Sequence, residues 1–123
     1  MYFSRVAGLS RKVAVFLALT LSLSASLTFA QGDEEAGLRS KIEKLRSSGK
    51  KSDLGLALYQ LGQYLAEKRR FDDALPFLEE TLAIDRSIAK PADVFKDISA
   101  IAMVYGFKKD FAAAEKFYGE CLN

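Results

Sequence analysis

The chain overlays itself when it is shifted by forty residues, and this internal match limits the fold more than any other feature of the sequence. Leu58 then meets Ile98, and Leu61 meets Ile101. The other matched pairs are Gly62 with Ala102, Leu65 with Tyr105, Phe71 with Phe111, Ala74 with Ala114, Phe77 with Phe117, Leu78 with Tyr118, Leu82 with Leu122, and Lys68-Arg69 with Lys108-Lys109. A fixed period of this size is typical of helical repeats, in which each unit covers the apolar face of its neighbour.

From about residue 34 onward, apolar residues recur three or four positions apart, which predicts helices separated by short breaks. The small residues Gly62 and Ala102 would let paired helices approach closely. Pro76 is expected to bend the third helix, because proline removes a backbone hydrogen bond. We expect five helices: one over residues 34–45; a second after a break at Ser47–Lys51, capped by Ser52 or Asp53; a third from about Phe71 to Ile88; a fourth opened by Pro91, which carries Phe95, Ile98, Ile101, Ala102 and Tyr105; and a fifth from Phe111 to Leu122, capped by Asp110.

The first thirty residues have the pattern of a secretory signal peptide. An uncharged apolar stretch ends in small residues at Thr28 and Ala30, which fits cleavage after Ala30. The alternative is an uncleaved membrane anchor, because residues 13–32 carry no charge over a length that can cross a bilayer. In either case the positive flank predicts an extracytoplasmic domain, secreted or periplasmic. The positive residues are Arg5, Arg11 and Lys12.

Charge and composition exclude several kinds of partner and site. Residues 31–123 carry 15 Lys and Arg and 16 Asp and Glu, a net charge of −1, so we expect no binding of nucleic acid. The chain has no His and one Cys, Cys121, which removes the usual zinc ligands and triad partners. No phosphate-binding loop or nucleophile motif occurs. We therefore expect no enzyme, no cofactor and no metal site.

Other charged positions and the cysteine have ordinary structural interpretations. The acidic pairs Asp72-Asp73 and Glu79-Glu80 are interpreted as solvated faces or helix starts. Cys121 is expected to be a small core residue, with a bridge between two chains as the alternative. The basic segments at helix ends are expected to complement helix dipoles, rather than to form a binding edge. They are Lys50-Lys51, Lys68-Arg69-Arg70 and Lys108-Lys109.

Two stretches carry a family pattern. The first is Leu61-Gly62, Leu65, Phe71, Ala74, Leu78 and Leu82, and the second is Ile101-Ala102, Tyr105, Phe111, Ala114, Tyr118 and Leu122. Both resemble the tetratricopeptide repeat (TPR), over about residues 54–123. Six extra residues per repeat make them similar to the longer repeats of the kinesin light chain type. The glycine usual at the hairpin turn is Arg69 in one repeat and Lys109 in the other. The resemblance implies an all-α fold of antiparallel helical hairpins, stacked as a short TPR-like α-solenoid.

The segment before the two repeats matches half of another one. Under the same shift, Leu38 meets Leu78 and Ile42 meets Leu82, as expected for a second helix that caps one end of the stack. The expected organisation is therefore a signal peptide or anchor at 1–30, a half repeat and linker at 31–52, and two repeats at 53–123. We expect the last hairpin to have an apolar face that no further helix covers. Stacked repeats need polar caps for stability, so a homo-oligomer through the C-terminal hairpin, or a truncated piece of a longer repeat protein, is an alternative.

The resemblance also implies a function. In the family, partner peptides lie in the concave groove formed by the first helix of each hairpin. Tyr59 and Gln63 stand where some members carry the Lys and Asn that clamp a C-terminal carboxylate, so that mode is not expected. We expect an extracytoplasmic protein–protein interaction module or adaptor without catalytic activity, with a structural self-associating unit as the alternative. The implied groove residues are Leu56, Tyr59, Gln63, Lys96, Ser99, Met103 and Phe107, although Tyr59, Met103 and Phe107 would equally suit a core.

Overall fold

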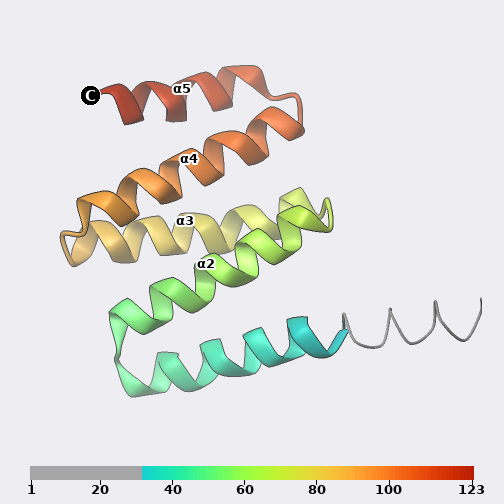
Figure 1. Cartoon of the computed structure of the whole chain (residues 1–123), viewed down its shortest axis with the longest axis vertical. Helices are drawn as coiled ribbons and strands as arrows, with labels where there is room; N and C mark the ends of the chain where they lie inside the picture. Colours follow the sequence, from blue (N-terminus) through green and yellow to red (C-terminus); the bar gives the residue numbers. More distant parts are fainter. Residues whose placement is uncertain (1–31) are drawn as a thin grey trace, which may run out of the picture. The chain divides into compact units, whose positions relative to one another are not determined.

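The computed structural model describes residues 32–123, and within that range the chain forms five α-helices and no strand. Residues Glu35–Asn123 form one folded unit in which each helix packs against the next along the chain (Figure 1). The signal peptide or anchor expected at residues 1–30 lies outside the described range. Among the described helices, none combines the length and apolarity needed to cross a membrane. The helices are the one over residues 32–48, α2 (Lys51–Glu67), α3 (Phe71–Ser87), α4 (Pro91–Phe107) and α5 (Phe111–Leu122).

The helix boundaries confirm the forty-residue period. Both ends of α4 lie forty residues after those of α2, and α5 begins forty residues after α3. The chain therefore contains two copies of one helical hairpin, the first formed by α2 and α3 and the second by α4 and α5. The predicted all-α helical-repeat architecture is correct.

The turns between helices repeat every twenty residues, which is half the period of the hairpins. Backbone φ is positive at Gly49, Arg69, Ala89 and Lys109, which are spaced by twenty residues. After each of the last three, the next amide donates a hydrogen bond to a carbonyl five residues back, with lengths of 2.9, 3.1 and 3.0 Å. This left-handed position favours glycine. Arg69 and Lys109 thus adopt the conformation of the glycine that TPR turns usually carry.

Two of the predicted helix ends differ from the structure. The helix over residues 32–48 continues through Ser47 and Ser48, whose hydroxyls bond to backbone carbonyls within that helix. The break is therefore shorter than expected, and α2 begins at Lys51 with Lys50 as N-cap. The caps predicted at Ser52 or Asp53 are wrong, because both residues lie inside the first turn of α2.

Two predicted helix starts are confirmed, and Pro76 does not end α3. Pro91 is the first residue of α4, as predicted. Asp110 caps α5, because its side chain accepts a hydrogen bond of 3.2 Å from the amide of Ala113. The helix α3 runs on through Pro76, whose side chain is exposed.

The core lies between consecutive helices and uses the matched positions. Leu58, Leu61 and Leu65 of α2 are fully buried, as is Ile101 of α4. The buried side chains form two clusters, one around α2 and the other between α3 and α4. Burial of each such side chain contributes about 1.5–3 kcal/mol before entropy is subtracted.

The second hairpin buries less of its second helix than the first. Leu78 and Leu82 of α3 are buried, but their counterparts Tyr118 and Leu122 of α5 are 48% and 89% exposed. The reason is that α4 covers α3 on the side away from α2, whereas within residues 32–123 no further helix covers α5. The expected bare face of the C-terminal hairpin is confirmed for the described part of the chain.

Two ion pairs show that the helix over residues 32–48 holds the place of a second helix. Arg46 binds Glu80 of α3 through two hydrogen bonds, and Arg86 of α3 binds Glu120 of α5 at 2.8 Å. Adding forty to both members of the first pair gives the second. Such exposed pairs contribute little stability, about 0–1 kcal/mol. Their equivalence nevertheless indicates that the half repeat stacks in the register of a full one.

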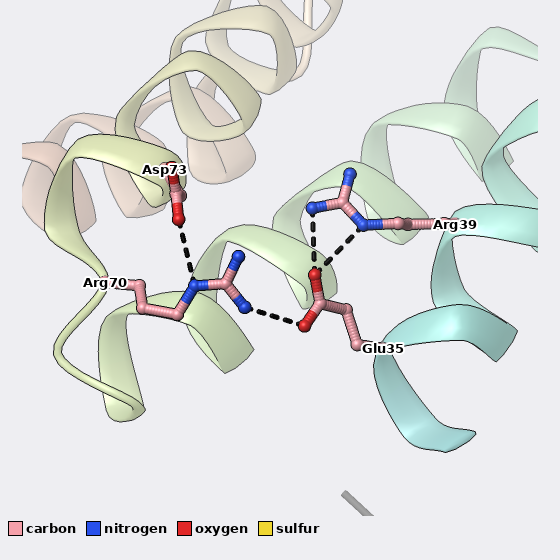
Figure 2. A network of polar contacts seen from close by, with 4 residues as sticks. All are labelled: Glu35, Arg39, Arg70 and Asp73. Carbon is pink, nitrogen blue, oxygen red and sulfur yellow. Dashed lines mark hydrogen bonds and ion pairs between the residues drawn. The ribbon is translucent and has the colours of Figure 1, made fainter. Parts of the chain in front are cut away.

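A second contact fixes the same helix to the turn between α2 and α3. Figure 2 shows the Glu35 carboxylate between the Arg39 and Arg70 guanidinium groups, with Arg70 also bonded to Asp73. The hydrogen bond from Arg39, together with Arg70, lowers the pKa of Glu35. Arg39 also lies 5.3 Å from the centre of the Phe77 ring. The network ties the half repeat to the turn between α2 and α3 and to α3 itself.

We predict that Gly62→Ala lowers the free energy of unfolding. A Cβ atom on Gly62 would lie 2.7 Å from the Cγ and Cδ2 atoms of Leu78, and Leu78 is buried and cannot move aside freely. Overpacking of this kind costs about 1–3 kcal/mol, of which the better helix propensity of alanine recovers at most about 1 kcal/mol. Chemical denaturation of the two proteins measures the difference.

The matched control is Gly106→Ala in α4, where an added Cβ meets nothing within 4 Å. That substitution is expected to raise the free energy of unfolding by up to about 1 kcal/mol. A Gly62→Ala protein as stable as the Gly106→Ala protein would contradict the close approach.

Candidate functional site

The seven predicted groove residues all lie on α2 and α4, the first helices of the two hairpins. Leu56, Met103 and Phe107 are each about half exposed, at 51%, 46% and 54%. Gln63 is exposed, and Tyr59, Lys96 and Ser99 are half-buried. Met103 and Phe107 therefore lie on a surface rather than in the core.

Two hollows connect α2 with α4 on this surface. One, of about 330 Å³, has a floor of apolar side chains with polar groups at its rim. The other, of about 360 Å³, lies further toward the beginning of α4. Ala100 and Met103 line both, so the two hollows adjoin each other along α4, and together they are called the groove. The first is lined by Gln63, Ala66, Glu67, Arg69, Phe71, Leu78, Ala100, Met103, Val104 and Phe107, and the second by Tyr59, Phe95, Lys96, Ser99, Ala100 and Met103.

Polar contacts order the middle of the groove. The amide of Gln63 donates a 2.9 Å hydrogen bond to the Tyr59 hydroxyl, and the ammonium of Lys96 lies 4.4 Å from the centre of the Tyr59 ring. Lys96 also donates to Asp93 at 3.1 Å. Burial raises the pKa of Tyr59, so its hydroxyl stays protonated and keeps a proton to donate to a ligand. The groove thus offers a cation and a hydroxyl donor beside apolar walls.

Some groove residues were missed by the sequence analysis. Phe95 was not among the predicted groove residues, but it is 56% exposed and lines the second hollow. Phe71 stacks on Phe107 with ring centres 5.8 Å apart, and this pair forms one wall of the first hollow. A wide apolar stripe on α4 gives no indication of which of its edges faces a neighbouring helix.

Most of the charged segments considered in the sequence have partners within the fold. Asp72 binds Lys108, and Asp73 binds Arg70, so the Asp72-Asp73 pair links neighbouring turns. Lys68 lies over the Tyr64 ring. Cys121 is half-buried, and its sulfur lies 3.6 Å from the Ser99 hydroxyl. Within residues 32–123, no group of three or more acidic or cysteine side chains could hold a metal ion.

One polar feature of the structure was not expected, a pair of acidic side chains in the core. Asp97 of α4 is fully buried, and Asp85 of α3 is 5% exposed. Among the described residues, nothing donates a hydrogen bond to either carboxylate oxygen of Asp97. The pKa of Asp97 is raised from 3.8 to about 7, mainly by burial and in part by hydrogen bonding to, and repulsion from, the neighbouring Asp85 carboxylate. Lys96 opposes the rise.

The internal repeat held the signal that could have revealed this pair. Forty residues before Asp97 stands Ala57, which is fully buried, and forty before Asp85 stands Leu45, which packs on the same apolar cluster. The self-match therefore assigns both aspartates to core positions. An acidic residue at a position whose equivalent in the other repeat is alanine is a departure that the sequence alone shows.

We predict that Asp97→Asn raises the free energy of unfolding at neutral pH, and that the gain disappears in acid. A carboxyl whose pKa is higher in the folded state stabilises the fold most below its unfolded value, here 3.8, and loses that stabilisation as the pH rises through about 7. The difference amounts to at most on the order of 4 kcal/mol. Denaturation curves for both proteins across that pH range measure it, and a gain independent of pH would contradict the prediction.

Comparison with known proteins adds one clear likeness. The chain is similar to the crystal structure of the TPR domain of Arabidopsis FLU, with a TM-score of 0.68, 21% sequence identity, and coverage of 75% of this chain and 77% of that chain. No protein-family model matches the sequence, and the comparison with curated proteins gives no match. At this identity the likeness concerns the fold. Together with the forty-residue period and the paired helices, it shows that residues 32–123 have a TPR-like helical-repeat fold.

Proposed function

We propose that this protein is an extracytoplasmic protein-interaction module without catalytic activity, which holds a segment of a partner protein in the groove between α2 and α4. The observation that carries this proposal is the run of exposed apolar side chains that line the two adjoining hollows, Phe95, Met103 and Phe107. Exposed apolar patches of this kind mark interaction sites. The TPR-like fold supports the same conclusion.

The polar rim suits a segment that carries both apolar and charged side chains. Glu67 and Arg69 line the first hollow, and among the described residues neither forms an ion pair. Lys96 lines the second hollow. An apolar side chain of the partner would fill a hollow while its charged neighbours meet these groups, because polar groups at the edge of an apolar pocket fix orientation.

The extracytoplasmic part of the proposal rests on the N-terminal sequence. A positive flank, an uncharged apolar stretch and small residues at Thr28 and Ala30 together follow the signal-peptide pattern. The finer resemblance to kinesin-light-chain repeats rests on the forty-residue period, which the helix boundaries share.

A second function, self-association through the C-terminal hairpin, is favoured by the surface of α5. Phe111, Tyr118 and Leu122 are exposed, and Leu122 at 89% is the most exposed of these three. An uncovered helix face at the end of a repeat stack favours a further helix as its cover. In that case the surface needed for assembly would be α5 rather than the groove.

We predict that the mature protein begins at or within two residues of Gln31. N-terminal sequencing of the protein isolated from the extracytoplasmic fraction measures the cleavage position. Replacing Ala30 with Arg should abolish processing, because signal peptidase requires a small residue there. An intact N-terminus on protein held in the membrane would instead support the anchor.

We predict that the groove binds the partner through Phe95 and Met103. A photoreactive amino acid at Met103 should capture the partner in the native extracytoplasmic fraction, and the same label at Glu79 on the exposed surface of α3 should not. With the captured protein purified, Phe95→Ala should weaken its binding by about tenfold or more, as for central apolar contacts. Stability should change little, because Phe95 is more than half exposed.

The matched control is Phe111→Ala, which removes an exposed phenylalanine of α5 outside the groove. Unchanged affinity in that protein together with a loss in Phe95→Ala supports the groove. Loss of a concentration-dependent dimer in Phe111→Ala, with Phe95→Ala unaffected, would instead support self-association. Sedimentation velocity distinguishes the two results.

A further inference from the structure

The chain contains two equivalent contacts, each between the second helix of one repeat and the first helix of the next, and the residues in them differ. Each such contact is called a joint. The joint between the helix over residues 32–48 and α2 holds Leu45 and Ala57, which belong to one apolar cluster. The joint between α3 and α4 holds Asp85 and Asp97 at the positions forty residues later. One molecule thus carries an apolar and an acidic version of the same contact.

The acidic joint is sealed from water and has no donor in its ionised form. Asp97 is fully buried, and within residues 32–123 no hydrogen bond reaches its two oxygens. On the other side of Asp85 lies Gly55 of α2, where an added Cβ would stand 3.1 Å from Asp85 Oδ1. Three helices therefore enclose the pair, and the absence of a side chain at position 55 makes room for it.

The charged and titratable groups around Asp97 do not neutralise it. Asp85 faces it from α3, and Asp93 from α4 adds a further negative charge. Lys96 of α4 is the cation that acts on Asp97, but its ammonium is bonded to Asp93 and lies over the Tyr59 ring of α2. Tyr59 is protonated and carries no charge, because burial raises its pKa.

Two buried carboxylates in this arrangement are stable together when they hold a proton. The protonated Asp97 can donate a hydrogen bond to Asp85, whereas two ionised groups repel each other in a medium of low dielectric constant. An unpaired buried charge is costly enough that the structure must either bind a proton or admit water. Admission of water requires α4 to move away from α3.

The moving helix is also one wall of the groove. Asp97 lies on the inner side of α4, while Lys96, Ser99 and Met103 of the same helix line the second hollow. The opposite wall, α2, is held on α3 by the close approach at Gly62. A shift of α4 relative to α3 therefore changes the distance between the two walls.

We propose that the Asp85–Asp97 pair is a proton-operated joint that sets the spacing of α2 and α4, so that the groove is narrow when the pair holds a proton and wider when it has lost it. The pH-dependent spacing of the two helices depends on the buried pair alone. Its effect on partner binding rests on the proposed function of the groove.

The test is a distance measurement on the full chain, which needs no partner. Nitroxide labels at Gln60 of α2 and Glu115 of α5, both exposed, report the separation of the two hairpins by double electron–electron resonance, with Cys121→Ser removing the native thiol. We expect a longer-distance population above the pH at which Asp97 titrates, about 7, and its reversal on acidification. Labels at Lys41 and Gln60, which span the apolar joint, should show no such change.

The decisive variant is Asp85→Leu with Asp97→Ala, which copies the apolar joint onto the acidic one and should abolish the pH-dependent population. Asp97→Asn should do the same, so that misfolding of one variant leaves the other as a test. Asp53→Asn, an exposed acid on α2, should leave the change intact. A distance independent of pH in the wild-type chain, or an equal pH response in both joint variants, overturns the proposal. Failure of the groove cross-linking would leave these distances unaffected, so the two proposals fail separately.

Discussion

Helices α2 and α3 approach so closely at Gly62 that a single added carbon would lie 2.7 Å from Leu78. Because this contact brings the two helices together, Leu58, Leu61 and Leu65 are fully buried. On the same helix α2, Gln63 lines the first hollow together with residues of α4. The groove is thus a consequence of packing on the other side of the same helix, and its walls are as rigid as the hairpins that carry them.

The two joints between hairpins show how a repeat can keep its backbone while its chemistry changes. Helix starts and turns keep their spacing whether the joint contains Leu45 and Ala57 or Asp85 and Asp97. Replacing buried apolar groups with unpaired carboxyls normally costs stability. Asp97 belongs to α4, which also lines the groove, so the titratable pair lies next to the surface where binding is proposed.

Much of the fold could be predicted from the sequence, because the forty-residue match reports the period and the small residues report the close approaches. The seven groove residues implied by the resemblance lie on α2 and α4, and all of them except Leu56 line the two hollows. Phe95 was not identified as a groove residue, because periodicity cannot tell the edge of a core stripe from the edge of a groove. The caps at Ser52 or Asp53 failed because a twenty-residue turn spacing, rather than capping chemistry, sets where α2 begins. The acidic pair was visible in the self-match but requires the packed structure to show its burial.

The left-handed turns have a consequence for how far this architecture is from its optimum. Arg69, Ala89 and Lys109 hold a conformation that costs an L-residue with a Cβ roughly 1–2 kcal/mol each, while the equivalent turn before α2 already carries Gly49. Three of the four turns thus carry a residue whose side chain disfavours the left-handed backbone conformation that the turn requires. Natural proteins are seldom selected for more stability than they need. Arg69 also lines the first hollow, so the stability that glycine could add without changing a groove residue lies at Ala89 and Lys109.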